Sequence, residues 1–91
     1  MNIKRALVGD TVRFTWVNSG TTPGALHLAL YDGAETLVSS QTMASSGNGH
    51  YYADVTLPDT PGFYVGETFA LVDGKDYKRR VKVRAVLGEV D

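Results

Sequence analysis

The spacing of turn-forming residues constrains the fold of this sequence more than any other feature. Gly and Pro interrupt the chain at intervals too short for most helices, and the segments between them are rich in Val, Thr, Tyr, Phe and Leu. Gly and Pro mark turns, whereas β-branched and aromatic residues favour strands. Pro23, Pro58 and Pro61 all fall in turn-like contexts, outside the predicted strands. The sequence therefore predicts an all-β fold.

Alternation with a period of two predicts about seven strands. A segment of six residues, 44–49, is expected to be an exposed, mobile loop, and a short helix stays open as an alternative over 34–46. Strands at this spacing indicate an antiparallel sandwich of two sheets, formed by a single domain over residues 1–91. The expected strands are Ile3–Val8, Thr11–Val17, Ala25–Tyr31, Thr36–Thr42, His50–Leu57, Phe63–Val72 and a last strand from Lys75 to Leu87.

Charge is distributed unevenly along the chain. Lys and Arg are absent from residues 14–74, and six of the nine basic residues lie between Lys75 and Arg84. In the last strand the basic residues alternate with apolar ones, and only Arg79 interrupts the apolar side. First and last strands can be neighbours in a sandwich, so we expect one basic patch that binds a partner. Its expected residues are Lys75, Lys78, Arg80, Lys82, Arg84, Lys4 and Arg5.

Three interpretations of these charges stay open. They can be solvated residues that discourage aggregation through an edge strand. They can form a docking face for an acidic protein surface, and the six acids of the middle segment would then give the molecule a basic end and an acidic end suited to self-association. Nucleic acid is the least favoured partner, because the net charge is −1 and Tyr77 is the one nearby aromatic expected to stack.

Catalytic and metal-binding chemistry lacks the necessary residues. The sequence has no Cys, which excludes disulfides and thiolate chemistry, and His27 and His50 have no third ligand at a suitable spacing. Asp32, Asp73 and Asp76 are expected in turns, because Lys75 would oppose a bound cation. No serine lies in a Gly-x-Ser-x-Gly elbow, and Asp54 and Glu67 are expected to point outward from strands. We therefore expect no enzyme, no metal and no cofactor.

One segment resembles immunoglobulin-like and fibronectin type III-like sandwich domains. Its sequence is Leu-Pro-Asp-Thr-Pro-Gly-Phe-Tyr, over residues 57–64, where a turn leads into an aromatic pair. The resemblance implies that Tyr64 hydrogen-bonds back to upstream backbone. Trp16 departs from the antibody pattern because it lies on the second expected strand, and the intersheet cysteines are absent, so an antibody-type domain is not expected.

Three short patterns together resemble small stand-alone sandwich proteins of bacteriophage virions. They are Gly-Asp-Thr-Val at residues 9–12, Pro-Gly-Phe-Tyr at 61–64 and Asp-Gly-Lys at 73–75. The resemblance implies a non-enzymatic decoration or adaptor subunit that docks on a repeated capsid, head–tail or tail protein. Such a protein is made in the host cytoplasm and resides in the virion, which agrees with the expected lack of a signal peptide or membrane segment.

A second function, from another class, is recognition of carbohydrate or a cell surface. It would use the loops at residues 18–20 and 45–51, where exposed Tyr51 and Tyr52 could stack on sugar rings. Core packing explains at least one of these two tyrosines equally well.

Overall fold

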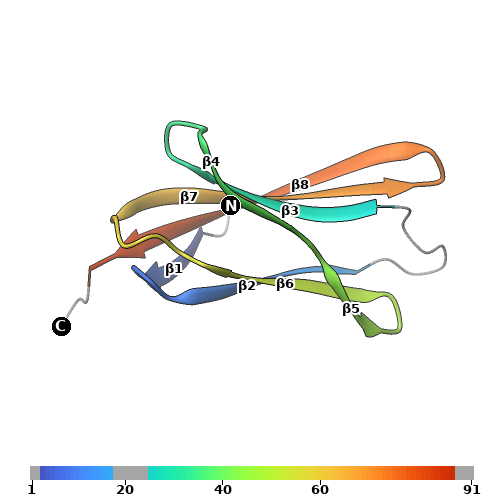
Figure 1. Ribbon diagram of the computed structural model, residues 1–91, viewed down its shortest axis with the longest axis horizontal. Coiled ribbons are helices and arrows are strands. Elements are labelled where there is room, and N and C mark those ends of the chain that lie inside the picture. The colour runs from blue at the N-terminus through green and yellow to red at the C-terminus, as the bar shows by residue number, and fades with distance from the viewer. Residues whose placement is uncertain (1–2, 18–24, 88–91) are drawn as a thin grey trace.

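The computed structural model describes residues 3–17 and 25–87, which form two facing β-sheets (Figure 1). The described residues contain no helix, so the predicted all-β sandwich is confirmed and the open alternative of a helix over 34–46 is excluded. Eight strands replace the seven that we expected. They are β1 (Ile3–Leu7), β2 (Thr11–Val17), β3 (Ala25–Asp32), β4 (Leu37–Thr42), β5 (Ala44–Gly47), β6 (His50–Thr56), β7 (Gly62–Val72) and β8 (Lys75–Val86).

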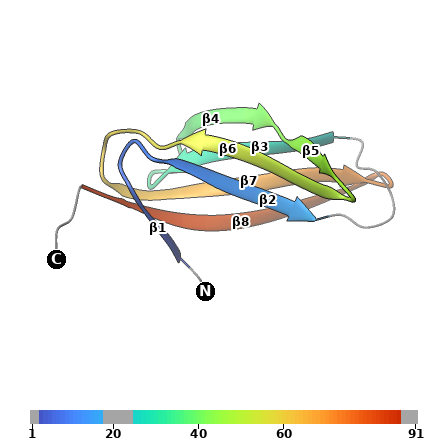
Figure 2. The ribbon, with the colours of Figure 1, turned by 90° about the horizontal axis from the view of Figure 1, so that it is seen from below.

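One sheet has five strands in the order β1-β8-β7-β3-β4, and the other has three in the order β2-β6-β5 (Figure 2). All pairs are antiparallel except β1 and β8, which run parallel. The predicted antiparallel sandwich is therefore confirmed except at this pair. After β1 the amide of Asp10 donates to the carbonyl of Leu7 in a turn, and the chain continues as β2 in the other sheet.

The core lies between the two sheets and is contributed by alternate residues of the strands. Leu28 and Leu30 of β3 and Val83 of β8 are almost completely buried on the five-stranded side. Phe14 of β2 is buried on the other side and packs over Gly66 of β7, where an added Cβ would overlap the phenyl ring. Burial of these side chains, each about 1.5–3 kcal/mol, is the main term that holds the sheets together.

The predicted tyrosine corner is present. Tyr64, 4% exposed, donates a hydrogen bond from its hydroxyl to the carbonyl oxygen of Thr60 at 2.6 Å. This bond ties the start of β7 to the turn that precedes it, as the resemblance to immunoglobulin-like domains implied.

The prediction of a loop over residues 44–49 is wrong, because Ala44–Gly47 form β5. The preceding residue, Met43, is buried and its amide donates to the carbonyl of Leu26, so the chain leaves the five-stranded sheet at this point. It then pairs with β6 through a tight turn in which Asn48 and Gly49 both have positive φ. The prediction that these residues are exposed is confirmed for 44–48.

Candidate docking face

The outward side of β8 carries a row of cations. Val83 and Ala85 are buried against the other sheet, so the alternate positions of β8 point away from the core. The predicted alternation is therefore confirmed in this half of the strand. The outward positions are held by Lys78, Arg80, Lys82 and Arg84.

Two phenylalanine rings of the neighbouring strand β7 lie close to these cations. The register places Phe69 opposite Lys78 and Phe63 opposite Arg84. The Lys78 ammonium lies 6.0 Å from the Phe69 ring centre, while Lys82 and Arg84 lie 5.3 Å and 5.9 Å from that of Phe63. Contacts of this kind attract a cation to the face of the ring and restrict its long side chain.

Arg80 differs from its neighbours because it forms ion pairs with carboxylates of the same chain. Its guanidinium donates to Glu35 at 2.8 Å and lies 3.2 Å from a carboxylate oxygen of Glu67. The hydrogen bond to Glu35, with smaller effects from the nearby charges of Glu35 and Glu67, raises the pKa of Arg80 above its ordinary value. Two acids of the middle segment thus lie beside the basic strand. The expected separation into a basic and an acidic end is wrong for these residues.

Arg5 joins the face, whereas two predicted members do not. Arg5 of β1 lies directly opposite Arg84 across the parallel pair. Lys4 is registered with core-facing Val83, so it points to the inner side of the sheet. Lys75 also occupies an inward position of its strand, because it lies opposite Val72, which packs against the core. We therefore define the outer cationic face as Arg5, Lys78, Arg80, Lys82 and Arg84. The prediction of one continuous patch is wrong for Lys4 and Lys75, which lie on the other side of the sheet, while their binding of a partner stays a prediction.

Exposed apolar side chains border these cations. Phe63 is 44% exposed and Leu7 is 42% exposed, and both occupy outward positions of the five-stranded sheet. Sequence reasoning missed the role of β7 in this face. A signal existed, because the two-residue Asp73-Gly74 turn fixes the register of the hairpin and so places Phe63 opposite Arg84.

Of the aspartates considered for metal binding, Asp32 and Asp73 serve in turns, whereas Asp76 lies in β8 and not in the predicted turn. One carboxylate oxygen of Asp32 accepts from the amides of Ala34 and Thr36 at 2.9 Å each, and Asp73 has the positive φ of a tight hairpin turn. His27 and His50 lie exposed on different sheets. Over residues 3–17 and 25–87 no three His, Cys, Asp or Glu side chains are grouped so as to hold a metal ion.

The aromatic residues considered for sugar stacking have other contacts. Tyr51 packs against the core, and Tyr52 lies 4.4 Å below the guanidinium of Arg13. Arg13 forms two hydrogen bonds with Asp54, at 2.8 Å and 2.9 Å, and these lower the pKa of Asp54. The other predicted sugar-binding loop, residues 18–20, lies outside the described residues.

Among the described residues, no helix is long and apolar enough to cross a membrane.

No protein-family model matches the chain, and no curated protein matches it. Solved structures do match. CopC from Methylosinus trichosporium OB3b has a TM-score of 0.67 and 16% identity, with 96% of this chain and 87% of that chain covered. A family 123 glycoside hydrolase from Clostridium perfringens has a TM-score of 0.57 and 14% identity, with 93% of this chain but 23% of that chain covered. At these identities the likeness is one of fold alone, and the chain is an immunoglobulin-like β-sandwich.

Proposed function

We propose that this protein is a non-enzymatic binding module that docks through its outer cationic face on an acidic protein surface. The observation that carries the proposal is the arrangement of Lys78, Lys82 and Arg84. Each is held over a phenyl ring, and within the described residues none of them has a carboxylate partner. Their charge is thus available to a partner, at side chains whose conformations are already restricted.

The apolar border of the face supports a protein partner. Stable protein interfaces combine buried aromatic residues and arginines with a polar rim. Exposed Phe63 beside Arg84 supplies such a pair near the start of β7 and the end of β8, and Leu7 extends it onto β1. A solvated edge strand, the competing interpretation of these charges, has no need for an exposed phenyl ring beside them.

We further propose that the partner is a repeated capsid, head–tail or tail protein of a phage-like particle. The support for this setting is the resemblance of three short sequence patterns to small virion sandwich proteins. An exposed face on one sheet suits attachment to a regular array, where many weak contacts add up through multivalency.

The test is co-sedimentation of the purified chain with its particle or with the isolated shell or tail protein. Arg84→Gln should weaken binding about tenfold, because it removes a cation that lies beside the exposed ring of Phe63. Arg13→Gln is the matched control: Arg13 is also an arginine over an aromatic ring, but it lies on the outer side of the other sheet. Its binding should stay within about twofold of the parent.

Absence of binding to every particle protein would remove the virion setting. Equal effects of Arg84→Gln and Arg13→Gln would contradict the outer cationic face as the docking surface. Binding to single-stranded DNA, or to sugars on a glycan array, that outcompetes the protein partner would support the alternative functions instead.

A further inference from the structure

A groove separates β2 from the first half of β8, on the side of the molecule opposite to β4. Strand β1 pairs only with residues Lys82 to Val86 of β8, so the edge of β8 over residues 75–81 has no strand beside it in the described part of the chain. Strand β2 is likewise the edge of its own sheet. Two strand edges thus border the groove, and each presents backbone groups that can pair with another chain.

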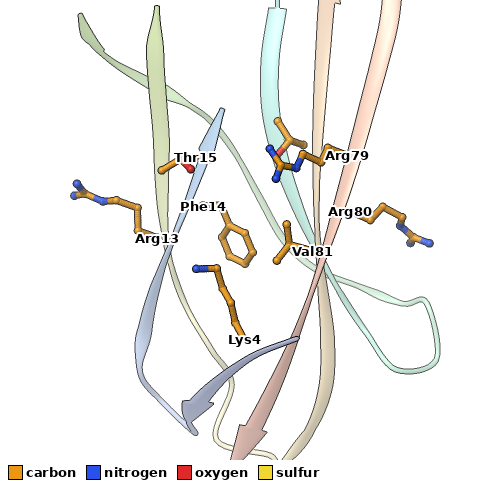
Figure 3. A pocket seen from close by; sticks show the side chains of 8 residues that line it. Lys4, Arg13, Phe14, Thr15, Arg79, Arg80 and Val81 are labelled. Carbon is orange, nitrogen blue, oxygen red and sulfur yellow. The ribbon is translucent and has the colours of Figure 1, made fainter. Parts of the chain in front are cut away.

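The groove consists of two adjoining cavities. The larger, of about 490 Å³, is lined by both sheets and includes Phe14 and Val81 (Figure 3). The smaller, of about 370 Å³, shares Thr15 and Arg79 with the larger one. We call the whole groove the seam, and its principal residues are Lys4, Phe14, Trp16, Tyr77, Arg79 and Val81.

The seam is positively charged, with no acid in its lining. Arg13 and Arg80 border the larger cavity but point away from it (Figure 3), and both are bound to carboxylates. Lys4 and Arg79 occupy core-facing positions of β1 and β8, and neither has a carboxylate partner among the residues described. Two cations therefore face the gap between the sheets without compensation, which favours an anionic occupant.

One further group in the seam lacks a partner. The indole Nε1 of Trp16 is buried, and within the described residues it has no hydrogen-bond acceptor. Trp16 lines the smaller cavity together with Tyr77 and Arg79. Buried donors are nearly always satisfied in native proteins, so this indole is an unusual feature of a residue that borders the smaller cavity.

We propose that the seam binds an extended acidic segment of a partner protein, which adds to the free edge of β8 as a further strand. Core-facing positions of that half-strand read Tyr77, Arg79 and Val81, an apolar–cation–apolar order. The complementary segment has a carboxylate residue flanked at two-residue spacing by apolar residues. Free backbone edges on both sides favour a peptide over a small anion, because strand addition also satisfies main-chain groups.

The seam adjoins the outer cationic face, because Lys78 also lines the smaller cavity, but its two uncompensated cations, Lys4 and Arg79, lie on the opposite side of the five-stranded sheet. It therefore goes beyond the proposed function, and each of the two can fail without the other.

The experiment uses the intrinsic fluorescence of Trp16, the one tryptophan of the chain. The probe is the heptapeptide acetyl-Thr-Val-Thr-Glu-Thr-Val-Thr-amide, which places Glu between two Val on one face of a strand. Titration should give a saturable change in Trp16 emission. The same peptide with Gln in place of Glu should bind about tenfold more weakly, since a charge-assisted hydrogen bond is lost.

Variants locate the binding site. Arg79→Gln and Lys4→Gln should each weaken binding of the Glu peptide about tenfold, while Arg79→Lys keeps most of the affinity. Arg13→Gln, which removes a cation that borders the same cavity but is held by Asp54, should change it less than about twofold. Circular dichroism confirms that each variant is folded. No binding of the Glu peptide, or equal binding by Arg79→Gln and the parent, overturns the proposal.

A final comparison separates strand addition from binding of a simple anion. A Glu peptide N-methylated at alternate residues cannot form the main-chain ladder on the methylated edge. We expect one of the two N-methylation patterns to abolish binding, because a strand pairs with β8 along one of its edges. Full affinity with both patterns, or equal affinity for free glutamate, would overturn strand addition.

Discussion

Gly66 and Phe14 show how single residues hold the two sheets at their distance. Gly66 lies on β7 between Val81 of β8 and Leu30 of β3, and the Phe14 ring fills the space where its side chain would lie. A Cβ there would be 2.7 Å from Cζ and 2.8 Å from Cδ1 of Phe14. The ring is 3% exposed, so an added Cβ would have to displace a packed aromatic side chain.

Gly66→Ala should therefore lower the free energy of unfolding by about 1–3 kcal/mol through overpacking. Urea denaturation measures the loss. Gly33→Ala is the control, since its added Cβ would meet backbone at an ordinary 3.6 Å. Equal stabilities of Gly66→Ala and the parent would show that Phe14 does not occupy this position.

Tyr64→Phe removes the hydroxyl that bonds to Thr60 and leaves the buried ring in place. We expect a loss of about 1 kcal/mol in the free energy of unfolding, the usual contribution of one hydrogen bond. Tyr77→Phe, at a tyrosine that is 46% exposed, should change stability little. A similar, small effect of both substitutions in urea denaturation would contradict the tyrosine corner.

At the scale of elements, the sequence predicts the strands with strong alternation and fails where that pattern is weak. The alternation of β8 and the Asp73-Gly74 turn predict the β7–β8 hairpin correctly. Strand β5 could not be predicted from apolar residues, since Ala44–Gly47 contribute none to the core and pair only because Met43 redirects the chain. The sequence also could not predict which side of β1 faces the core. Lys4 and Arg5 are both charged, and only the pairing with β8 decides which of them faces inward.

The pairing of β2 with β6 contains a cross-strand ion pair that gives a pH-dependent stability. Arg13 lies opposite Asp54, and their hydrogen bonds lower the pKa of Asp54 below its ordinary value of about 3.9. A carboxyl group whose pKa is lowered by folding stabilises the native state above its unfolded-state pKa, and this contribution disappears as the pH falls through the folded-state pKa.

Asp54→Asn should therefore lower the Tm slightly at about pH 7, and the difference from the parent should shrink as the pH falls below the ordinary aspartate pKa of about 3.9. Thermal unfolding followed by circular dichroism at several pH values tests this. Asp76→Asn, at an exposed acid with no ion pair in the described residues, serves as the control. A Tm difference for Asp54→Asn that grows toward low pH would contradict the assigned pair.

At the scale of the whole molecule, the sandwich places the cations of β1 and β8 on the two sides of the five-stranded sheet. Outward residues of β8 and β1 form the outer cationic face, whereas Lys4 and Arg79 lie between the sheets in the seam. The sequence predicted the basic strand and its proximity to the first strand, but not this division. A sequence shows which residues of a strand share one side of the sheet. It does not show how far β1 extends along β8, because that depends on the tertiary pairing of the two strands.

The central claim is that the protein docks through the outer cationic face, and lysine footprinting by mass spectrometry tests it most directly. Acetylation rates of each lysine are compared in the free chain and in the chain bound to its particle or shell protein. Lys78 and Lys82 should react at least about fivefold more slowly when bound, because they lie within the buried interface. Unchanged rates at both lysines in a complex that demonstrably forms would contradict the account.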